Sequence, residues 1–233
     1  MEAVILAGGK GTRLRPHTDE IPKPLLPVGG RPVVELLLKQ MQKCGVSHVT
    51  MAVNHLFVQI INSIGDGQEF GLKIDYSRES KALSTVGPLK LIKKLPDNFI
   101  VANADVLTDL DFRDLYEDHL RSGAKLTVAT NARTNPIDFG VLTVDDNGRA
   151  IGFNEKPVFN FVVSMGIYVF AKSILKYVPS EQSFGFDSLI FKLLENDEPI
   201  NTFPFSGYWL DIGRPDDYQK ANEDVERIRD IMA

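Results

Sequence analysis

The sequence predicts an α/β protein with three Rossmann-like layers, formed as a single domain over residues 1–233. The expected central sheet is mixed and mainly parallel, because short apolar runs typical of buried strands alternate with segments of helical periodicity. A small antiparallel portion is expected in the second half, where Asp145-Asp146-Asn147-Gly148 separates two short strand-like segments. Asn-Gly readily adopts the positive φ angles of a tight hairpin turn.

Local patterns predict the elements in chain order. Residues 3–6 and 99–104 are apolar runs expected to form buried strands. Residues 32–44 have apolar side chains at helical spacing, with Pro32 in the first turn and Gly45 as the stop. The other expected strands are residues 48–53, 72–76, 125–130, 141–144, 150–153, 162–170 and 208–212. The other expected helices are residues 56–64, 88–95, 111–121 with Asp111 as N-cap, 186–195, and 215 to about 231.

Charge and cysteine content exclude several classes of protein. A formal net charge of −5 argues against a sequence-independent nucleic-acid binder, which needs an excess of Lys and Arg. Cys44 is the only cysteine, which excludes an internal disulfide, and its helical spacing predicts a core position. The four histidines lack the spacing of a zinc site. The first residues lack the features of a signal peptide and no apolar run has transmembrane length, so we expect a cytoplasmic protein with no membrane partner.

A glycine-rich loop follows the first predicted strand. Three glycines between Leu6 and Leu14 allow successive backbone N–H groups to converge on phosphate oxygens. The loop is not that of the P-loop NTPases, because Gly11 follows Lys10 where that motif needs Ser or Thr. It also departs from the dinucleotide-binding motif, since Leu14 stands at the third glycine position and prolines forbid an immediate helix. An extended segment, residues 13–28, is expected instead.

The stretch from Gly8 to Val28 closely resembles the G-G-x-G-T-R-L-x-P-x-T-x-x-x-P-K-x-L-L-P-V signature of sugar-phosphate nucleotidylyltransferases. The resemblance continues through Glu155-Lys156-Pro157, Gly166-Ile167-Tyr168 and Trp209-Leu210-Asp211-Ile212-Gly213, so it covers nearly the whole chain in order. It implies an enzyme that joins a nucleoside triphosphate (NTP) to a sugar 1-phosphate and releases pyrophosphate, with Mg²⁺ as cofactor.

The resemblance also implies the residues of the site. The expected nucleotide-binding residues are Leu6, Ala7, Gly8, Gly9, Gly11, Thr12, Arg13, Lys23, Val53, Thr85 and Gly87. The expected sugar-phosphate-binding residues are Asn103, Gly140, Glu155, Lys156 and Gly166. Asp105 and Asp211 would hold the metal, and Arg13, Lys23 and Asp105 would be catalytic.

The positions of the two acids agree with this assignment. Asp105 directly follows a predicted buried strand, at the edge where open α/β sheets bind ligands. Asp211 lies inside an apolar segment, where an unpaired charge is costly, so a metal ion or a salt bridge must compensate it. Two carboxylates completed by phosphates and water are a common Mg²⁺ site.

Substrate identity is the open question. Gly87-Pro88-Leu89 resembles the mannose-1-phosphate guanylyltransferase branch and its heptose-1-phosphate relatives, which favours GTP over UTP, dTTP or CTP. Ala104 and Ser84 replace glycines that the family usually has, which motivates a non-catalytic regulatory paralogue that binds a nucleotide sugar as an alternative. Asp109-Leu110-Asp111 spells the Asp-x-Asp of glycosyltransferases that consume nucleotide sugars, a second alternative. No left-handed β-helix tail is expected, and a homodimer is left open.

Overall fold

A central sheet of seven strands organises the protein, for which a computed structural model describes residues 1–227. The strand order is β12-β8-β11-β6-β1-β4-β5. All neighbours are parallel except β11, which runs antiparallel to both β6 and β8. The predicted mixed, mainly parallel sheet is therefore confirmed. The strands of this sheet are β1 Glu2–Ala7, β4 His48–Val53, β5 Lys73–Arg78, β6 Asn98–Asn103, β8 Leu126–Pro136, β11 Val158–Ala171 and β12 Ile200–Pro204.

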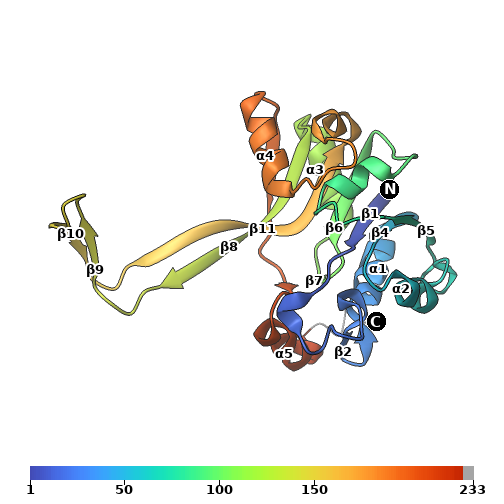
Figure 1. The fold of residues 1–233 in the computed structure, drawn as a ribbon, viewed down its shortest axis with the longest axis horizontal. Coiled ribbons are helices and arrows are strands. Elements are labelled where there is room, and N and C mark those ends of the chain that lie inside the picture. The colour runs from blue at the N-terminus through green and yellow to red at the C-terminus, as the bar shows by residue number, and fades with distance from the viewer. Residues whose placement is uncertain (228–233) are drawn as a thin grey trace.

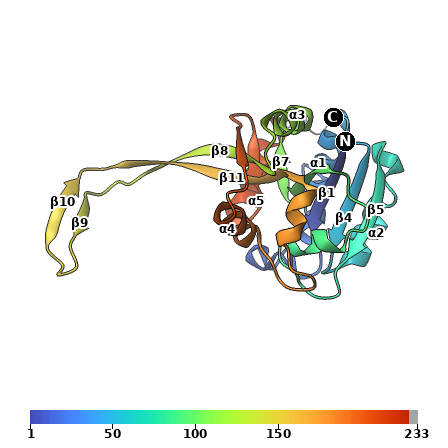
Figure 2. The same cartoon turned by 90° about the horizontal axis from the view of Figure 1, so that it is seen from above.

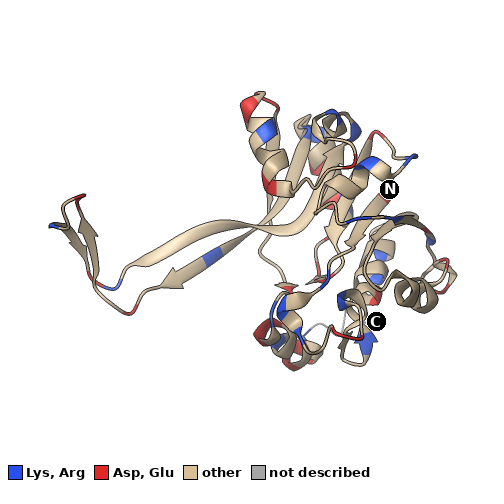
Figure 3. Cartoon of the chain, in the orientation of Figure 1, with Lys and Arg blue, Asp and Glu red and all other residues tan. Residues whose placement is uncertain are grey.

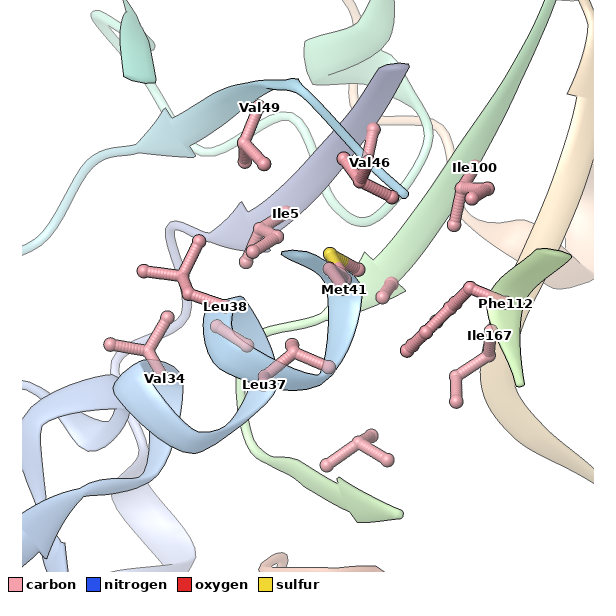
Figure 4. Close-up of a cluster of buried hydrophobic side chains, with 14 of the residues drawn as sticks. Ile5, Val34, Leu37, Leu38, Met41, Val46, Val49, Ile100, Phe112 and Ile167 are labelled. Atoms are coloured by element: carbon pink, nitrogen blue, oxygen red, sulfur yellow. The ribbon is translucent and has the colours of Figure 1, made fainter. Parts of the chain in front are cut away.

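Helices cover both faces of this sheet and complete three layers (Figure 1). On one face, α1, α2 and α3 bury side chains such as Met41, Ile60 and Phe112 against Ile5 and Ile100. Figure 4 shows this cluster, with side chains of α1 packed against those of the strands. On the other face, α4 contributes Leu189 and Leu193. The helices are α1 Val33–Lys43, α2 Phe57–Ile64, α3 Phe112–Ser122, α4 Phe186–Glu195 and α5 Pro215–Glu223.

Most predicted boundaries are correct to within two residues. Asp111 caps α3, since its Oδ1 accepts a hydrogen bond from the Arg113 N–H at 2.7 Å. Cys44 is buried at the end of α1, as its spacing predicts, and burial raises the pKa of its thiol. The turn at Asp145–Gly148 joins strands β9 Val141–Val144 and β10 Ala150–Asn154, with Gly148 at a φ of 78°.

Some expectations were wrong. Residues 88–95 form no α-helix but a shorter 3₁₀ turn, Gly87–Leu91, and residues 13–28 are interrupted by 3₁₀ turns at Thr12–Leu14 and Lys23–Leu25. The last helix ends at Glu223 rather than near residue 231, and residues 228–231 of that prediction lie outside the described residues. Four strands were not predicted: β2 Pro27–Val28, β3 Arg31–Pro32, β7 Val106–Thr108 and β12.

The largest difference concerns β8 and β11, which extend far beyond the predicted 125–130 and 162–170. β12 pairs with β8 only as far as Thr130, and β6 pairs with β11 only from Ile167 onward. Residues 131–136 and 158–163 therefore pair with each other alone. With the β9–β10 hairpin they form a thin two-stranded arm, residues 131–163, which projects from the body (Figures 1 and 2).

Candidate active site

The ends of four parallel strands meet at one edge of the sheet and define the site. Ala7 at the end of β1 is in register with Val53 at the end of β4, which is in turn in register with Arg78 of β5. On the other side of β1, Leu6 is in register with Asn103 at the end of β6. The segments that follow these strands are thereby brought together, as expected for the ligand-binding edge of an open α/β sheet.

The glycine loop follows β1 at this edge. Gly8 leaves no room for a side chain, because a Cβ there would lie 2.5 Å from the Glu79 Oε1. Gly11 has a φ of 64°, and the buried Thr18 hydroxyl donates a hydrogen bond to its carbonyl at 2.8 Å. Gly9 has open space around its Cα. Thr18 and Glu79 therefore lie against one side of the loop, and its middle, at Gly9, remains accessible to a ligand.

Two acids and two bases converge beside this loop. Strand β13, Trp209–Asp211, pairs with β7 so that Asp211 is opposite Val106, directly after Asp105. The Ile212 N–H donates to the Asp105 carbonyl at 3.0 Å, which fixes the two segments together. Lys23 forms an ion pair with Asp105 in which both side chains are about 85% buried, at 13% and 15% exposure.

Arg13 completes this group. A Cβ built at Gly213 would lie 3.5 Å from one Arg13 guanidinium nitrogen and 3.6 Å from one carboxylate oxygen of Asp211. The Arg13 charge therefore lies close to Asp211, and it offsets a small part of the rise in pKa that burial and Asp105 cause in that acid. The sequence-predicted residues Arg13, Lys23, Asp105 and Asp211 thus come together, although they span nearly two hundred positions of the chain.

Asp211 has one buried carboxylate oxygen that no hydrogen bond satisfies. Burial, and next the charge of Asp105, raise its pKa to about 6. Its Oδ1 is buried and, alone among the buried side-chain atoms of residues 1–227, has no hydrogen-bond partner. An orphaned carboxylate oxygen beside a second carboxylate fits a divalent cation. Among the described residues, no three or more His, Cys, Asp or Glu side chains lie close enough together to hold a metal ion by themselves. A metal at Asp105 and Asp211 therefore needs oxygens from substrate and water as well.

A cavity of about 520 Å³ opens over Arg13, Lys23 and Asp105, whereas Asp211 lies beside its lining residue Gly213 and does not line it. Most of the predicted nucleotide-binding residues line it, namely Leu6, Ala7, Gly8, Gly9, Gly11, Thr12, Arg13, Lys23 and Thr85. Val53 and Gly87 are buried behind its wall, and their neighbours Asn54 and Pro88 line it instead. Gly87 is constrained by packing, since a Cβ there would lie 3.0 Å from the Gln182 carbonyl.

Glu79, an acidic residue that lines this cavity, is not predicted from the sequence. Glu79 follows β5 and is 5% exposed, with burial raising the pKa of its carboxyl. It accepts a hydrogen bond from the Leu83 N–H at 3.0 Å. The strand-end rule that identified Asp105 also applies to Glu79, but its flanking residues are ordinary polar ones and give no motif.

The two departures from the family pattern have different structural consequences. Ser84 has a φ of 65°, a left-handed conformation in which glycine is unstrained. Ala104 is not among the residues with positive φ, and its methyl group lies in the apolar core. Ser84 therefore carries local strain, whereas Ala104 does not.

The predicted sugar-phosphate residues divide into two groups. Asn103 lines the cavity, and Gly166 lies against it, since a Cβ at Gly166 would be 2.6 Å from the Asn103 Nδ2. Gly140, Glu155 and Lys156 lie on the exposed arm and do not line the cavity. Figures 1 and 2 show the arm projecting out of the body, with β9 and β10 at its far tip. Within one chain, the structure does not bring these two groups together.

The alternative Asp-x-Asp motif has structural roles. Asp111 caps α3, and the Asp109 Oδ1 accepts a hydrogen bond from the Tyr208 N–H at 2.8 Å. Neither acid lines the cavity.

No helix within the described part of the chain is both long and apolar enough to cross a membrane.

Comparisons with known proteins agree with the resemblance. The chain is 36% identical over 241 residues to a UTP–glucose-1-phosphate uridylyltransferase of Synechocystis sp., and the match covers 95% of the chain and 62% of that relative. It is 34% identical over 228 residues to a mannose-1-phosphate guanyltransferase of Debaryomyces hansenii, with 94% and 62% covered. The chain thus spans 62% of the length of these relatives.

Solved structures give the same result. HddC from Yersinia pseudotuberculosis, complexed with GMP-PN, has a TM-score of 0.74 and 27% identity, over 96% of this chain and 98% of that one. A putative glucose-1-phosphate thymidylyltransferase from Bacillus anthracis, in complex with a sucrose, has a TM-score of 0.77 and 25% identity, with 96% and 94% covered. The family described as nucleotidyl transferase matches residues 2–228. The chain therefore belongs to the nucleotidyl transferase family, in which its relatives are sugar-1-phosphate nucleotidyltransferases.

Proposed function

We propose that the protein is a Mg²⁺-dependent enzyme that joins GTP to a mannose- or heptose-type sugar 1-phosphate, giving a GDP-sugar and pyrophosphate. The observation that carries this proposal is the convergence of Asp105, Asp211, Lys23 and Arg13 beside the glycine loop. Two anionic substrates repel each other, and this group supplies the positive charge and the carboxylates that would allow them to meet.

The proposed step is an in-line attack by an oxygen of the sugar phosphate on the α-phosphorus. The bond between that phosphorus and the oxygen bridging to the β-phosphate breaks, and pyrophosphate leaves with both bonding electrons. Arg13 stabilises the charge that grows on the leaving pyrophosphate, and Lys23 contacts the α-phosphate. When bound by Asp105 and Asp211, Mg²⁺ would neutralise phosphate charge. No nucleophilic side chain is required.

Glu79 supports the choice of GTP. The Watson–Crick edge of guanine presents two adjacent donors, N1–H and N2–H, whereas uracil and thymine present only N3–H. A buried carboxylate is an acceptor that can receive both guanine hydrogen bonds. Glu79 lines the same cavity as the glycine loop, on the wall formed by the ends of β4 and β5.

The sugar phosphate would lie on the Asn103 side of the cavity, next to Gly166. Its remaining contacts are assigned to Gly140, Glu155 and Lys156. The mannose assignment is supported by the relatives named mannose-1-phosphate guanyltransferase.

We also propose one catalytic domain, a cytoplasmic location and a homodimer. A buried, unreactive Cys44 as the only cysteine is compatible with a reducing compartment. The support for the dimer is structural and is argued below.

The test is a panel of GTP, UTP, dTTP and CTP against mannose, glucose and heptose 1-phosphates, scored by pyrophosphate release with and without Mg²⁺. We expect release with GTP that depends on the metal. Binding of a GDP-sugar with no release for any pair would favour the regulatory paralogue. Transfer of sugar from a GDP-sugar to an acceptor would favour the glycosyltransferase.

A further inference from the structure

The arm exposes apolar side chains of the kind that proteins normally bury, and no other part of residues 1–227 covers them. Nine of the fourteen large hydrophobic side chains that are exposed among residues 1–227 lie between residues 139 and 162. Phe139 and Val162 are 77% and 73% exposed. On the hairpin, Leu142 and Phe153 are directly opposite one another on one face and are both exposed. Contiguous exposed apolar surface of this kind marks an interaction site.

The two long strands of the arm also have little of the usual protection of sheet edges, with one charged residue and one proline, both in β8. Arg133 is the only charged residue in 131–136 and 158–163. Figure 3 shows the long strands almost free of charge, with charged residues at the tip. Proteins normally protect open edges with charges or prolines within the strands, and an isolated two-stranded ribbon is only marginally stable in water. The arm therefore requires a covering partner.

The size and charge of the arm indicate a second copy of this chain as that partner. A standard interface uses about 20–30 residues on each side, which is close to the length of the arm. The tip, residues 137–157, has four acidic residues against two basic ones. At the root of the arm, a cavity of about 320 Å³ is lined by Arg133, Lys220 and Arg227 against the single acid Asp224. Tip and root are thus complementary in charge, as a two-fold interface between identical arms requires.

The root cavity is also next to the catalytic group. Trp209 lines it, and Trp209 and Asp211 lie on the same face of β13, two residues apart. A tip that docks there would bring Glu155 and Lys156 toward Asp105 and Asp211. The outer part of β8, residues 131–136, spans about 20 Å at 3.3 Å per residue, so the tip can reach well past the surface of its own body.

We propose that two copies exchange their arms about a two-fold axis, so that Glu155 and Lys156 of one copy complete the sugar-phosphate side of the other copy's active site. The assignment of these residues to the sugar phosphate rests on the proposed function, but the exchange of arms rests on the structure alone. Each active site would then be built from two chains, with Arg13, Lys23 and the two acids from one and the tip from the other.

Oligomeric state tests the exchange without any assay of activity. Light scattering of the purified chain should give a dimer, and the double variant Leu142→Glu, Phe153→Glu should be a folded monomer. Val58→Glu is the matched control, because Val58 is an exposed apolar residue of α2 outside the arm, and this variant should stay dimeric. A monomeric wild-type chain, or a double variant that remains dimeric, would overturn the proposal.

Mixing two inactive variants tests which chain supplies the tip. Lys23→Ala has a defective body and an intact tip, whereas Lys156→Ala has an intact body and a defective tip. If the arms exchange, an equilibrated one-to-one mixture should recover about a quarter of wild-type pyrophosphate release, because half of the dimers are mixed and each has one intact site. Arms that act within their own chain would give no recovery. Wild-type inactivity on every NTP and sugar phosphate would contradict the proposed function and leave light scattering to decide the exchange.

Discussion

The carboxyl edge of the sheet and the arm differ in how their side chains are held. At the edge, Lys23 and Asp105 are paired and largely buried, and the glycine loop is fixed from behind by Thr18 and Glu79. In the arm, residues of the same expected site lie in solvent on a ribbon with no third strand. Catalysis by charge neutralisation requires groups fixed before the reaction. Within one chain, most residues expected to bind the nucleotide therefore lie together around the cavity, whereas Gly140, Glu155 and Lys156, expected to bind the sugar phosphate, lie away from it.

The largest expected effect is on turnover, and it comes from a substitution at the carboxyl edge of the sheet. Arg13→Ala should lower turnover by about 10²–10³-fold, as for the loss of one transition-state donor. Arg15→Ala is the control, because Arg15 is exposed and pairs only with Asp19 among the ion pairs of the described residues, and it should remain close to wild type. Steady-state kinetics of pyrophosphate release measure both. Equal rates for Arg13→Ala and the wild type would contradict the role of Arg13 in stabilising the leaving pyrophosphate.

Glu79→Gln should change base preference. An amide offers one acceptor and one donor, so it loses a guanine hydrogen bond and suits uracil better. We expect the ratio of kcat/KM for GTP to that for UTP to fall about 10–100-fold, in line with the discrimination of one bidentate pair. The rate with the preferred sugar phosphate at saturating nucleotide should change much less. An unaltered ratio would show that Glu79 does not read the base.

Asp211→Asn should change stability in a manner that depends on pH. The folded protein holds the Asp211 proton more tightly than the unfolded chain, because burial and Asp105 raise its pKa from 3.8 to about 6. Stability contributed by this acid is therefore present below pH 4 and lost as the pH rises to 6. Without divalent metal, the variant should have a higher Tm than the wild type above pH 6 and a similar one near pH 4. A Tm difference independent of pH would contradict the raised pKa of Asp211 in the folded protein.

The smallest expected effect is at Ser84. Ser84→Gly removes the strain of a left-handed conformation, and this gain outweighs the greater entropy that glycine gives the unfolded chain. The free energy of unfolding should therefore rise by up to about 1 kcal/mol. Ser77→Gly, near the end of β5, should instead lower the free energy of unfolding by about 0.5–1 kcal/mol. Denaturant unfolding of both variants measures the difference. A loss of stability in Ser84→Gly would mean that the hydroxyl makes a compensating contact.

The sequence predicts the inner strands of the sheet well, because these depend on local signals, and most of the residues that the family resemblance assigns to the nucleotide line one cavity. Buried apolar runs locate β1, β4 and β6, and the ligand edge of a parallel sheet then follows from where these strands end. Glu79 obeys the same rule but stands among ordinary polar residues, so no motif reveals it.

The arm could not be predicted in this way. Residues 131–136 are largely polar and 158–163 are exposed on both faces, so neither shows the alternation of a strand packed on its own core. The exposed apolar side chains of residues 158–162 fit the proposed second copy rather than a core within the same chain. Similarly, residues 88–95 have helical composition but pack as a 3₁₀ turn against residues 182–184.

A crystal structure of the chain with Mg²⁺ and a non-hydrolysable GTP analogue tests the central claim most directly. We predict a cation bound by Asp105 and the Asp211 Oδ1, with the triphosphate along residues 8–13 and the tip of a second copy next to it. A triphosphate bound elsewhere, with no cation at the two acids, would contradict the account.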